Sequence, residues 1–211
     1  YAKRKSQEFG IRNLEYMQAD ILELSSLGRH FDIVECAGVL HHMNDPMAGW
    51  RVLVDCVKPG GLMKIGLYSD LARRHIQEIR EEINQSTDFG DEQTIRSWRN
   101  AIIKSELKHH NTVKTSFDFF SLSSMRDLIF HVQEHRFNLP QIKKSLDELG
   151  LEFCGFEANP MLKNFKAMNP EKDAEYDLAI WNTFEEKHPR TFAGMYQFWC
   201  QKVHGGSQVA L

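Results

Sequence analysis

Two adjacent histidines, His41 and His42, have side chains suited to proton transfer. An imidazole gains or loses its proton near neutral pH, so either residue is a candidate general base. Tyr68 is a third candidate, because it follows an apolar run and its hydroxyl both donates and accepts hydrogen bonds. Other interpretations stay open: one histidine packs at its loop while the other faces solvent, and Tyr68 is an aromatic residue at a pocket rim.

The elements around these residues predict how they are positioned. Phe31–Ala37 is a short apolar run with a single charge inside it at Glu35, which is typical of a buried parallel strand. A polar loop over residues 38–46 and a helix follow, and Pro59–Gly61 form the turn before a second strand. Ligands of open α/β sheets bind at the carboxyl ends of the strands, so the polar loop is a candidate binding site. A carboxylate in a buried strand needs a partner, and Lys64 is the candidate for Glu35.

Two motifs in this region carry a family resemblance. Residues 31–46 read F-D-x-V-x-x-x-x-V-L-H-H-M-x-D-P, and residues 57–65 read V-K-P-G-G-L-M-K-I. In this order and at this separation, they resemble the central motifs of class I S-adenosylmethionine-dependent methyltransferases. The resemblance implies an α/β fold with a Rossmann-like methyltransferase sheet. It also implies S-adenosylmethionine as the cofactor and methyl transfer to an acceptor that the sequence leaves unidentified.

The resemblance further implies which residues contact the cofactor. Residues Leu14–Asp20 resemble the third strand of the family's sheet, with the acidic residue that ends it. In the family such an acidic residue, here Asp20, hydrogen-bonds the adenine amino group, and the next residue, Ile21, packs on the adenine ring. The backbone expected along the cofactor is that of Ala37, Gly38 and Val39.

One departure from the family concerns its glycine-rich loop, which holds the methionine part of the cofactor. No G-x-G-x-x-G or G-x-G-x-G occurs in the sequence, and the acidic residue that binds the ribose has no counterpart either. We therefore expect that the chain lacks its natural amino-terminal part and is a carboxyl-terminal portion of an enzyme. The alternative is a cofactor-incompetent remnant that acts as a binding or interaction domain. Nicotinamide oxidoreductases are disfavoured, because their fingerprint is missing too.

The rest of the chain predicts a helical insertion between two parts of a core. Residues 1–68 and 138–204 are expected to form the partial Rossmann-like core, and residues 69–137 a helical insertion or lid that selects the acceptor. Asn138 is a predicted helix cap and Gly150 a predicted helix stop. The helices expected in the insertion cover residues 70–84, 91–108 and 123–136, with Gly90 between the first two. Later elements are strands at Leu151–Ala158 and Gly194–Val203, helices at 161–168 and 174–188, and a disordered tail at 205–211.

Residues His131–His135 match the H-x-x-E-H pattern of a class of zinc peptidases. A helix would place both histidines on one face, as two zinc ligands require. Short motifs arise by chance, however, and a third ligand would have to come from His109, His110 or an acidic residue elsewhere. We therefore predict no metal site. The remaining alternatives are that His131, Glu134 and His135, with Asp118 and Arg126, line the acceptor pocket, or that they form simple surface pairs.

Composition excludes some classes of function. The formal net charge is −3 and the pI about 6.4, so the chain shows no clear signal for nucleic-acid binding. No apolar run approaches the ~20 residues that span a bilayer, which predicts no membrane partner and a cytoplasmic location. The cysteines Cys36, Cys56, Cys154 and Cys200 are widely spaced within apolar patterns, so we expect buried free thiols.

Missing strands would leave open sheet edges. In the family's sheet order, the two absent strands lie between the strand of Leu14–Gln18 and the strand that contains Ile33. Unpaired edges form hydrogen bonds with other strands. We expect either that the Leu14 strand moves beside the Ile33 strand or that two chains associate through these edges.

Overall fold

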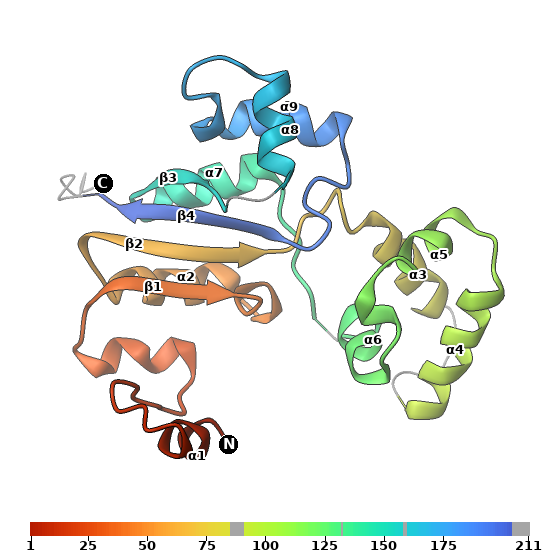
Figure 1. Cartoon of the computed structure of the whole chain (residues 1–211), viewed down its shortest axis with the longest axis horizontal. Helices are drawn as coiled ribbons and strands as arrows, with labels where there is room; N and C mark the ends of the chain where they lie inside the picture. Colours follow the sequence, from red (N-terminus) through yellow and green to blue (C-terminus); the bar gives the residue numbers. More distant parts are fainter. Residues whose placement is uncertain (85–90, 132, 158–159, 204–211) are drawn as a thin grey trace.

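The computed structural model describes residues 1–84, 91–131, 133–157 and 160–203. A four-stranded sheet with the order β1-β2-β4-β3 forms its centre (Figure 1). Strands β1 and β2 are parallel, whereas β4 is antiparallel to both β2 and β3. The strands are β1 (Phe31–Ala37), β2 (Val57–Leu67), β3 (Leu151–Phe156) and β4 (Tyr196–Lys202). This arrangement confirms the expected α/β fold with a Rossmann-like sheet.

The two parallel strands approach each other closely at their carboxyl ends. Ala37 pairs with Gly66 in the β1–β2 register. A Cβ atom added to Gly66 would lie 2.8 Å from Ala37 Cβ and 2.8 Å from Met195 Sδ, so only glycine fits. Met195, which precedes β4, therefore lies beside the ends of both parallel strands.

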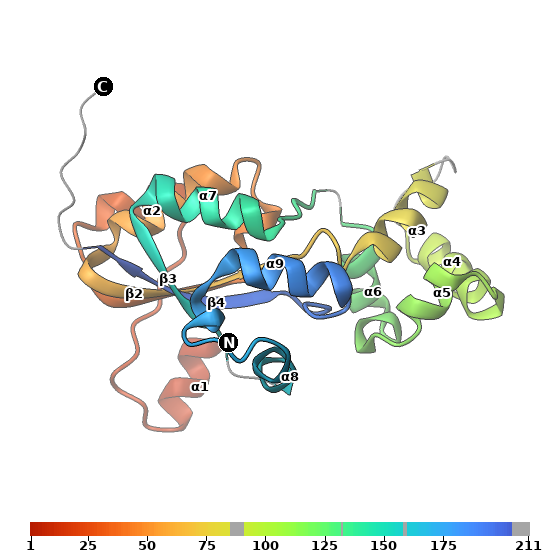
Figure 2. The ribbon, with the colours of Figure 1, turned by 90° about the horizontal axis from the view of Figure 1, so that it is seen from above.

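Two capped helices cover one face of the sheet. Helix α2 (Pro46–Asp55) begins at Asp45, whose carboxylate accepts hydrogen bonds from the next helical amides. Helix α7 (Leu139–Leu149) starts with a capping box between Asn138 and Gln141, and Gly150 ends it with a φ of 65°. Figure 2 shows α2 and α7 on the same side of the sheet, with α1 (Ala2–Glu8) and α8 (Pro160–Met168) on the other.

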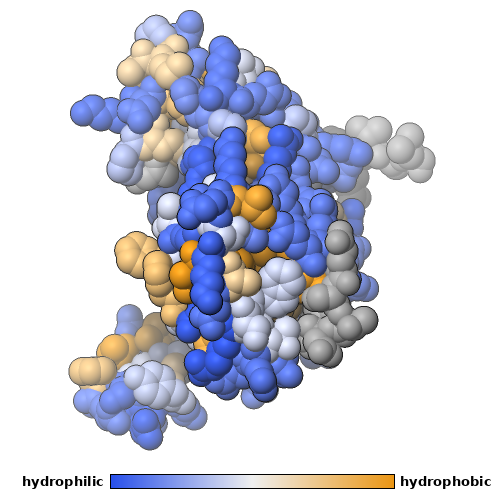
Figure 3. Space-filling model, turned by 90° about the vertical axis from the view of Figure 1, so that its right-hand side faces the viewer, coloured by the Kyte–Doolittle hydropathy of each residue, from blue (hydrophilic) through white to orange (hydrophobic). Residues whose placement is uncertain are grey.

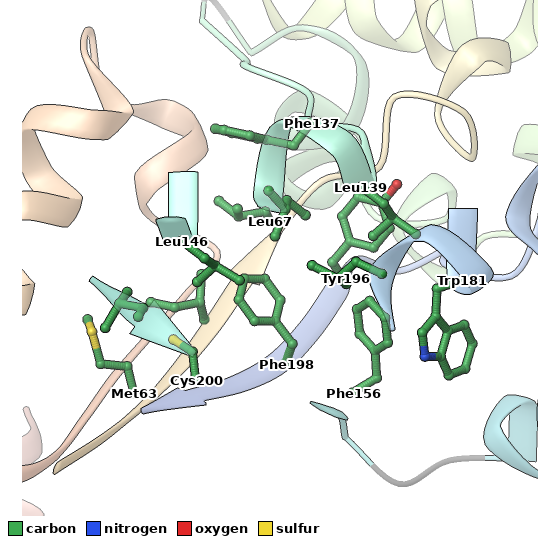
Figure 4. Close-up of a cluster of buried hydrophobic side chains, with 14 of the residues drawn as sticks. Met63, Leu67, Phe137, Leu139, Leu146, Phe156, Trp181, Tyr196, Phe198 and Cys200 are labelled. Carbon is green, nitrogen blue, oxygen red and sulfur yellow. The ribbon is translucent and has the colours of Figure 1, made fainter. Parts of the chain in front are cut away.

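The main core lies between the sheet and the helices that flank it. Figure 4 shows side chains of β2, β3, β4, α7 and α9 (Leu178–Lys187) meeting in this cluster. Trp181 of α9 is fully buried and stacks on Phe165 of α8 with ring centroids 3.5 Å apart. Tyr196 and Phe198 of β4 are also fully buried. Each of these large side chains contributes about 1.5–3 kcal/mol through burial of its apolar surface.

A second hydrophobic cluster forms a helical unit, defined here as residues 74–130. Its buried members include Ile79, Ile102 and Met125. The unit lies beyond the carboxyl end of β2 (Figure 1). Figure 3 views the molecule from the side of the helical unit, and the surface there is predominantly hydrophilic with separate hydrophobic patches. The helices are α3 (Arg74–Asn84), α4 (Glu92–Lys104), α5 (Lys108–Val113) and α6 (Leu122–Ile129). The division into domains at residues 69–137 stays a prediction.

The predicted helix over residues 123–136 is wrong in its second half, because α6 ends at Ile129. Residues 133–137 belong to no helix and form hydrogen bonds with the core. His135 N donates to the His41 carbonyl at 2.7 Å, and Phe137 N donates to the Tyr68 carbonyl at 2.9 Å. These distant partners replace the hydrogen bonds that a continued helix would have made. Gly90, Ala158 and the tail at 205–211 lie outside the described residues.

The predicted strand at Leu14–Gln18 is also wrong. The segment forms no strand and is exposed along its length. A strand needs a neighbour for its backbone hydrogen bonds, and the described part of the chain places none beside this segment. It has therefore not moved beside β1, which lies at the end of the sheet order.

Strand β1 is not the buried strand that its composition predicts. Ile33 and Glu35 are exposed on one face, while Cys36 is buried on the other. The expected partner of Glu35 is confirmed, because Lys64 Nζ lies 3.2 Å from its carboxylate. All four cysteines are free as expected, although Cys154 is only partly buried. Within the described ranges, no helix is long and apolar enough to cross a bilayer.

Candidate functional site

The three residues predicted to be catalytic lie together at the carboxyl ends of β1 and β2. His41 and His42 belong to η2 (Leu40–His42), a short 3-10 turn after β1, and Tyr68 directly follows β2. The His41 ring stacks on the Tyr68 ring with centroids 3.8 Å apart. The His42 ring lies 4.4 Å from His41 and 5.8 Å from Tyr68. Parallel strands end at the same edge of a sheet, which explains why loops distant in sequence meet here.

His41 is completely buried beneath Tyr68. Burial, and to a smaller extent the neighbouring His42, Arg73 and His131, lower the pKa of His41 to about 3, although the Gly66 backbone raises it. Within the described residues, neither ring nitrogen makes a hydrogen bond of normal geometry. The side chain is thus neutral and packed, an environment that favours a structural role over direct contact with an acceptor.

His42 is only partly buried and has a defined tautomer. Its Nδ1 lies 3.0 Å from the Gln133 carbonyl oxygen. Since a carbonyl only accepts hydrogen bonds, Nδ1 carries the proton and Nε2 holds the lone pair of the neutral ring. The His131 ring packs against His42 at 3.9 Å. Of the two histidines, His42 therefore has the state and exposure that a general base requires.

Tyr68 is held between two groups. The His41 ring and the Arg73 guanidinium each lie 3.8 Å from the Tyr68 ring centroid, and two groups at this distance must occupy opposite faces. Burial raises the pKa of Tyr68, and the Arg73 charge lowers it. The hydroxyl therefore stays protonated near neutral pH and is available as a hydrogen-bond donor.

A buried carboxylate, Glu134, connects this cluster with the helical unit. Its fully buried side chain accepts from Arg73 at 3.1 Å through Nε and at 2.8 Å through Nη2. Arg80 Nη1 lies 3.4 Å and Arg136 Nη1 lies 3.7 Å from the same carboxylate. We call Glu134 and these arginines the arginine cluster. The described residues of the H-x-x-E-H match are not helical and arginines engage its carboxylate, so the match lacks the helical geometry that the zinc motif requires.

A cavity of about 400 Å³ opens beside Tyr68, between the core and the helical unit. We call it the strand-end cavity. Polar and charged side chains make up much of its wall, and Met195 and Gly194 border it at the start of β4. Its lining includes Tyr68, Arg73, Asp118, Arg190, Met195 and Gln197. Of the residues predicted to line an acceptor pocket, Asp118 lies here, whereas Arg126 borders a separate hollow and His131, Glu134 and His135 border neither.

The residues predicted to contact the cofactor fall in two places. Asp20 caps η1 (Ile21–Leu27), accepting from Leu22 N at 2.9 Å, and Ile21 packs against the main core. The backbone of residues 37–39 continues from β1 into the loop of the histidines. Gly38 has a φ of 77°, and a Cβ atom there would meet only Met195 Cε at 4.0 Å, so its surroundings are open.

The backbone at residues 37–39 fits one side of an S-adenosylmethionine site, because it is open to solvent at a strand end. Ala37 and Val39 are both exposed. The glycine-rich loop and the ribose-binding acidic residue are absent from the sequence. This chain therefore lacks two of the groups that hold the cofactor in the family that it resembles.

The comparison with protein families agrees with this geometry. Residues 1–65 match the sequence profile of a family described as methyltransferase domain. The match is confined to about the first third of the chain. Most of the match covers the exposed segment before β1, β1 itself, α2 and most of β2, so the domain includes both parallel strands of the site.

Solved structures extend the similarity to nearly the whole chain. PKMT2 from Rickettsia typhi superimposes with a TM-score of 0.68 at 15% identity, covering 96% of this chain and 40% of that protein. Its complex with AdoHcy gives a TM-score of 0.66 at 14% identity, covering 96% of this chain and 41% of that protein. At this identity the likeness shows the fold alone, and it agrees with the Rossmann-like sheet described above.

A relative in sequence is an uncharacterized protein of Synechococcus sp., which is 28% identical over 169 residues. The match covers 74% of this chain and 39% of that protein. The chain thus spans about two fifths of the length of the relatives that it matches.

Proposed function

We propose that this chain takes part in S-adenosylmethionine-dependent methyl transfer, as the carboxyl-terminal portion of a class I methyltransferase. The observation that carries the proposal is the open backbone of residues 37–39, which Met195 connects with the strand-end cavity. Support also comes from PKMT2, a protein of similar fold that has been solved in complex with AdoHcy. In this proposal, residues outside this chain complete the cofactor site.

The chemistry defines what the side chains must do. S-adenosylmethionine, when bound, supplies an activated methyl group for an in-line displacement. The protein has to align the acceptor and exclude water, and it needs a base only where the acceptor must lose a proton. We assign the alignment to the strand-end cavity, with the Tyr68 hydroxyl as a donor to the acceptor. We assign the base role to His42 Nε2, and packing beneath Tyr68 to His41.

The wall of the strand-end cavity favours a polar acceptor. Arg190 and Asp118 carry opposite charges on it, and Gln197 adds an uncharged polar group. A lipid chain or a quinone ring would need an apolar wall in their place, because buried polar groups without partners are costly. We propose that the acceptor presents a polar group to this cavity.

Cofactor binding is tested by calorimetric titration of the chain with S-adenosylmethionine and AdoHcy. We expect Asp20→Ala to weaken binding about 10-fold, because one hydrogen bond to the ligand is lost. Asp32→Ala is the matched control, since Asp32 is an exposed aspartate that pairs with Lys58. Equal affinities of Asp20→Ala and Asp32→Ala would contradict the role of Asp20. Absence of binding at millimolar ligand would mean that groups outside this chain are indispensable for holding the cofactor.

We also propose that the free edge of β1 pairs with the same edge in a second copy of the chain. β1 ends the sheet order, and Ile33 on it is 57% exposed. The resemblance to the family places a further strand at this edge, and an unpaired edge seeks such a partner. The symmetric contact of two β1 edges would form a twofold dimer.

Replacing Ile33 by lysine should weaken this association at least about 10-fold, because a charge at a strand edge opposes pairing. The measurement is sedimentation velocity over a range of concentrations. Leu107→Lys provides the control, since Leu107 is 52% exposed in the helical unit, far from the edge in sequence. If the unsubstituted chain stays monomeric at high concentration, the proposed dimer is refuted.

A further inference from the structure

A group of histidines and carboxylates lies in the helical unit, apart from the candidate site. Glu82 of α3 faces two histidines of α5: its Oε1 lies 2.6 Å from His109 Nε2, and its Oε2 lies 2.9 Å from His110 Nε2. One ligand atom from each residue falls within 4.8 Å of the others. Among the residues that the structure describes, no other set of three His, Cys, Asp or Glu side chains converges as closely.

A second carboxylate orients the first histidine. Glu78, one turn before Glu82 on α3, places Oε2 3.2 Å from His109 Nδ1. A neutral imidazole has a single N–H, so a proton on Nδ1 that is donated to Glu78 leaves a lone pair on Nε2, which faces the Glu82 carboxylate. Two lone pairs that face each other are satisfied by a cation between them. Histidines that bind metals usually donate their other N–H to a carboxylate in this way.

His110, the other histidine of the group, is deeply buried. Its side chain is only 6% exposed, and its Nδ1 is buried without a hydrogen-bond partner in the described residues. An ion on Nε2 would leave Nδ1 as it is, so the argument for a bound ion rests on the three convergent ligand atoms. Nothing in the proposed methyl transfer uses these residues.

We propose that Glu82, His109 and His110 bind a divalent transition-metal ion, best matched by zinc, and that Glu78 orients His109. Two imidazole nitrogens and a carboxylate oxygen are a common ligand set for zinc, whereas magnesium and calcium prefer oxygen ligands alone. Bond lengths of about 2.0–2.2 Å place tetrahedral ligand atoms about 3.3 Å apart. The observed separations of 2.6 and 2.9 Å need to widen by less than 1 Å. A water molecule takes the fourth position.

Such a site would join α3 to α5. Helix α5 has six residues, too few to be stable alone, so its place depends on contacts with its neighbours. An ion held by residues of both helices would fix α5 against α3. The structure therefore assigns to the metal a stabilising role within the helical unit.

The test is a titration of the chain with zinc against a chromophoric chelator. We expect Glu82→Gln and His109→Ala to weaken zinc binding by more than about 100-fold, and Glu78→Gln by about 10–100-fold, because ligands matter more than the groups that orient them. His30→Ala is the matched control, because it removes an exposed histidine outside the proposed site. His131→Ala controls for zinc bound near His42.

Cobalt(II) in place of zinc gives a second readout, since tetrahedral cobalt absorbs intensely in the visible range. We expect this absorption with the unsubstituted chain and its loss in Glu82→Gln. Equal zinc affinity in Glu82→Gln, His109→Ala and His30→Ala would overturn the proposal, as would equal affinity for zinc and magnesium. Circular dichroism without metal checks the folding of each variant. If a variant that lacks a ligand does not fold, the zinc affinity of Glu78→Gln tests the proposal instead. The Glu78 side chain is 57% exposed, so we expect this substitution to leave the fold intact.

Discussion

Replacing Glu134 by glutamine should lower the free energy of unfolding by about 3–5 kcal/mol, the range for removing one partner of a buried ion pair. The Glu134 side chain is fully buried, and that of Arg73 is 5% exposed. Glutamine keeps the size of the side chain but not its charge. The guanidinium groups would then remain close together in a site without a compensating carboxylate.

The distances explain why several charges depend on this one residue. Arg73 donates to both carboxylate oxygens, and Arg80 and Arg136 lie within 3.7 Å of the same group. Burial lowers the pKa of Arg80, and the charges of Arg136 and Arg73 lower it further, whereas Glu134 raises it. The negative charge of Glu134 thus offsets the free-energy cost of burying these cations.

Urea unfolding followed by circular dichroism measures the effect. Glu92→Gln is the matched control, since Glu92 forms an exposed i,i+4 pair with Arg96 in the same helical unit, and we expect less than about 1 kcal/mol there. The arginine cluster connects the two hydrophobic clusters, so the fluorescence of Trp98 in the helical unit should change at lower urea than the main transition. Equal losses of stability in the two variants would show that the buried position of Glu134 is unimportant.

Local signals explain the parts of the fold that were predicted correctly. The cap at Asn138 and the stop at Gly150 depend on neighbouring residues alone, so the sequence reports them directly. The turn predicted at Pro59–Gly61 is wrong, because these residues lie within β2, whose register with β1 is irregular between Phe31 and Ile33. The segment after Ile129 was predicted as helix because its own pattern permits one. Its structure is decided by the backbones of His41 and Tyr68, far away in sequence.

The same distinction holds for the candidate site. His41, His42 and Tyr68 could be predicted to meet, because each follows a strand and the ends of parallel strands share an edge. That His41 is buried while His42 is partly exposed depends on the contacts that Gln133 and His135 make with the histidine loop, which no local pattern reports. Glu134 was noticed only as part of a chance motif, since its principal partner Arg73 is 61 residues away.

Acidification should destabilise the chain through His41. Burial and neighbouring charges lower the pKa of His41 in the folded state to about 3, from an ordinary value of 6.5 in the unfolded chain. Above pH 6.5 both states are neutral at this residue, so its contribution to stability is constant. Between pH 6.5 and 3 only the unfolded state takes up the proton, and this favours unfolding by about 1.4 kcal/mol per pH unit.

Urea unfolding at several pH values between 7 and 4.5 measures this slope. We expect His41→Gln to be less stable than the unsubstituted chain at pH 7, because the stack on Tyr68 is lost, but to lose less stability on acidification. Over the two units below pH 6.5, the difference in slope amounts to about 2–3 kcal/mol. His30→Gln, which removes an exposed histidine, controls for the loss of an imidazole as such. If His41→Gln and the unsubstituted chain lose stability in parallel, His41 takes up its proton in the folded state as well. His41 would then not be a neutral, packed residue. The assignment of the base role to His42 depends on His41 being neutral and would fail with it.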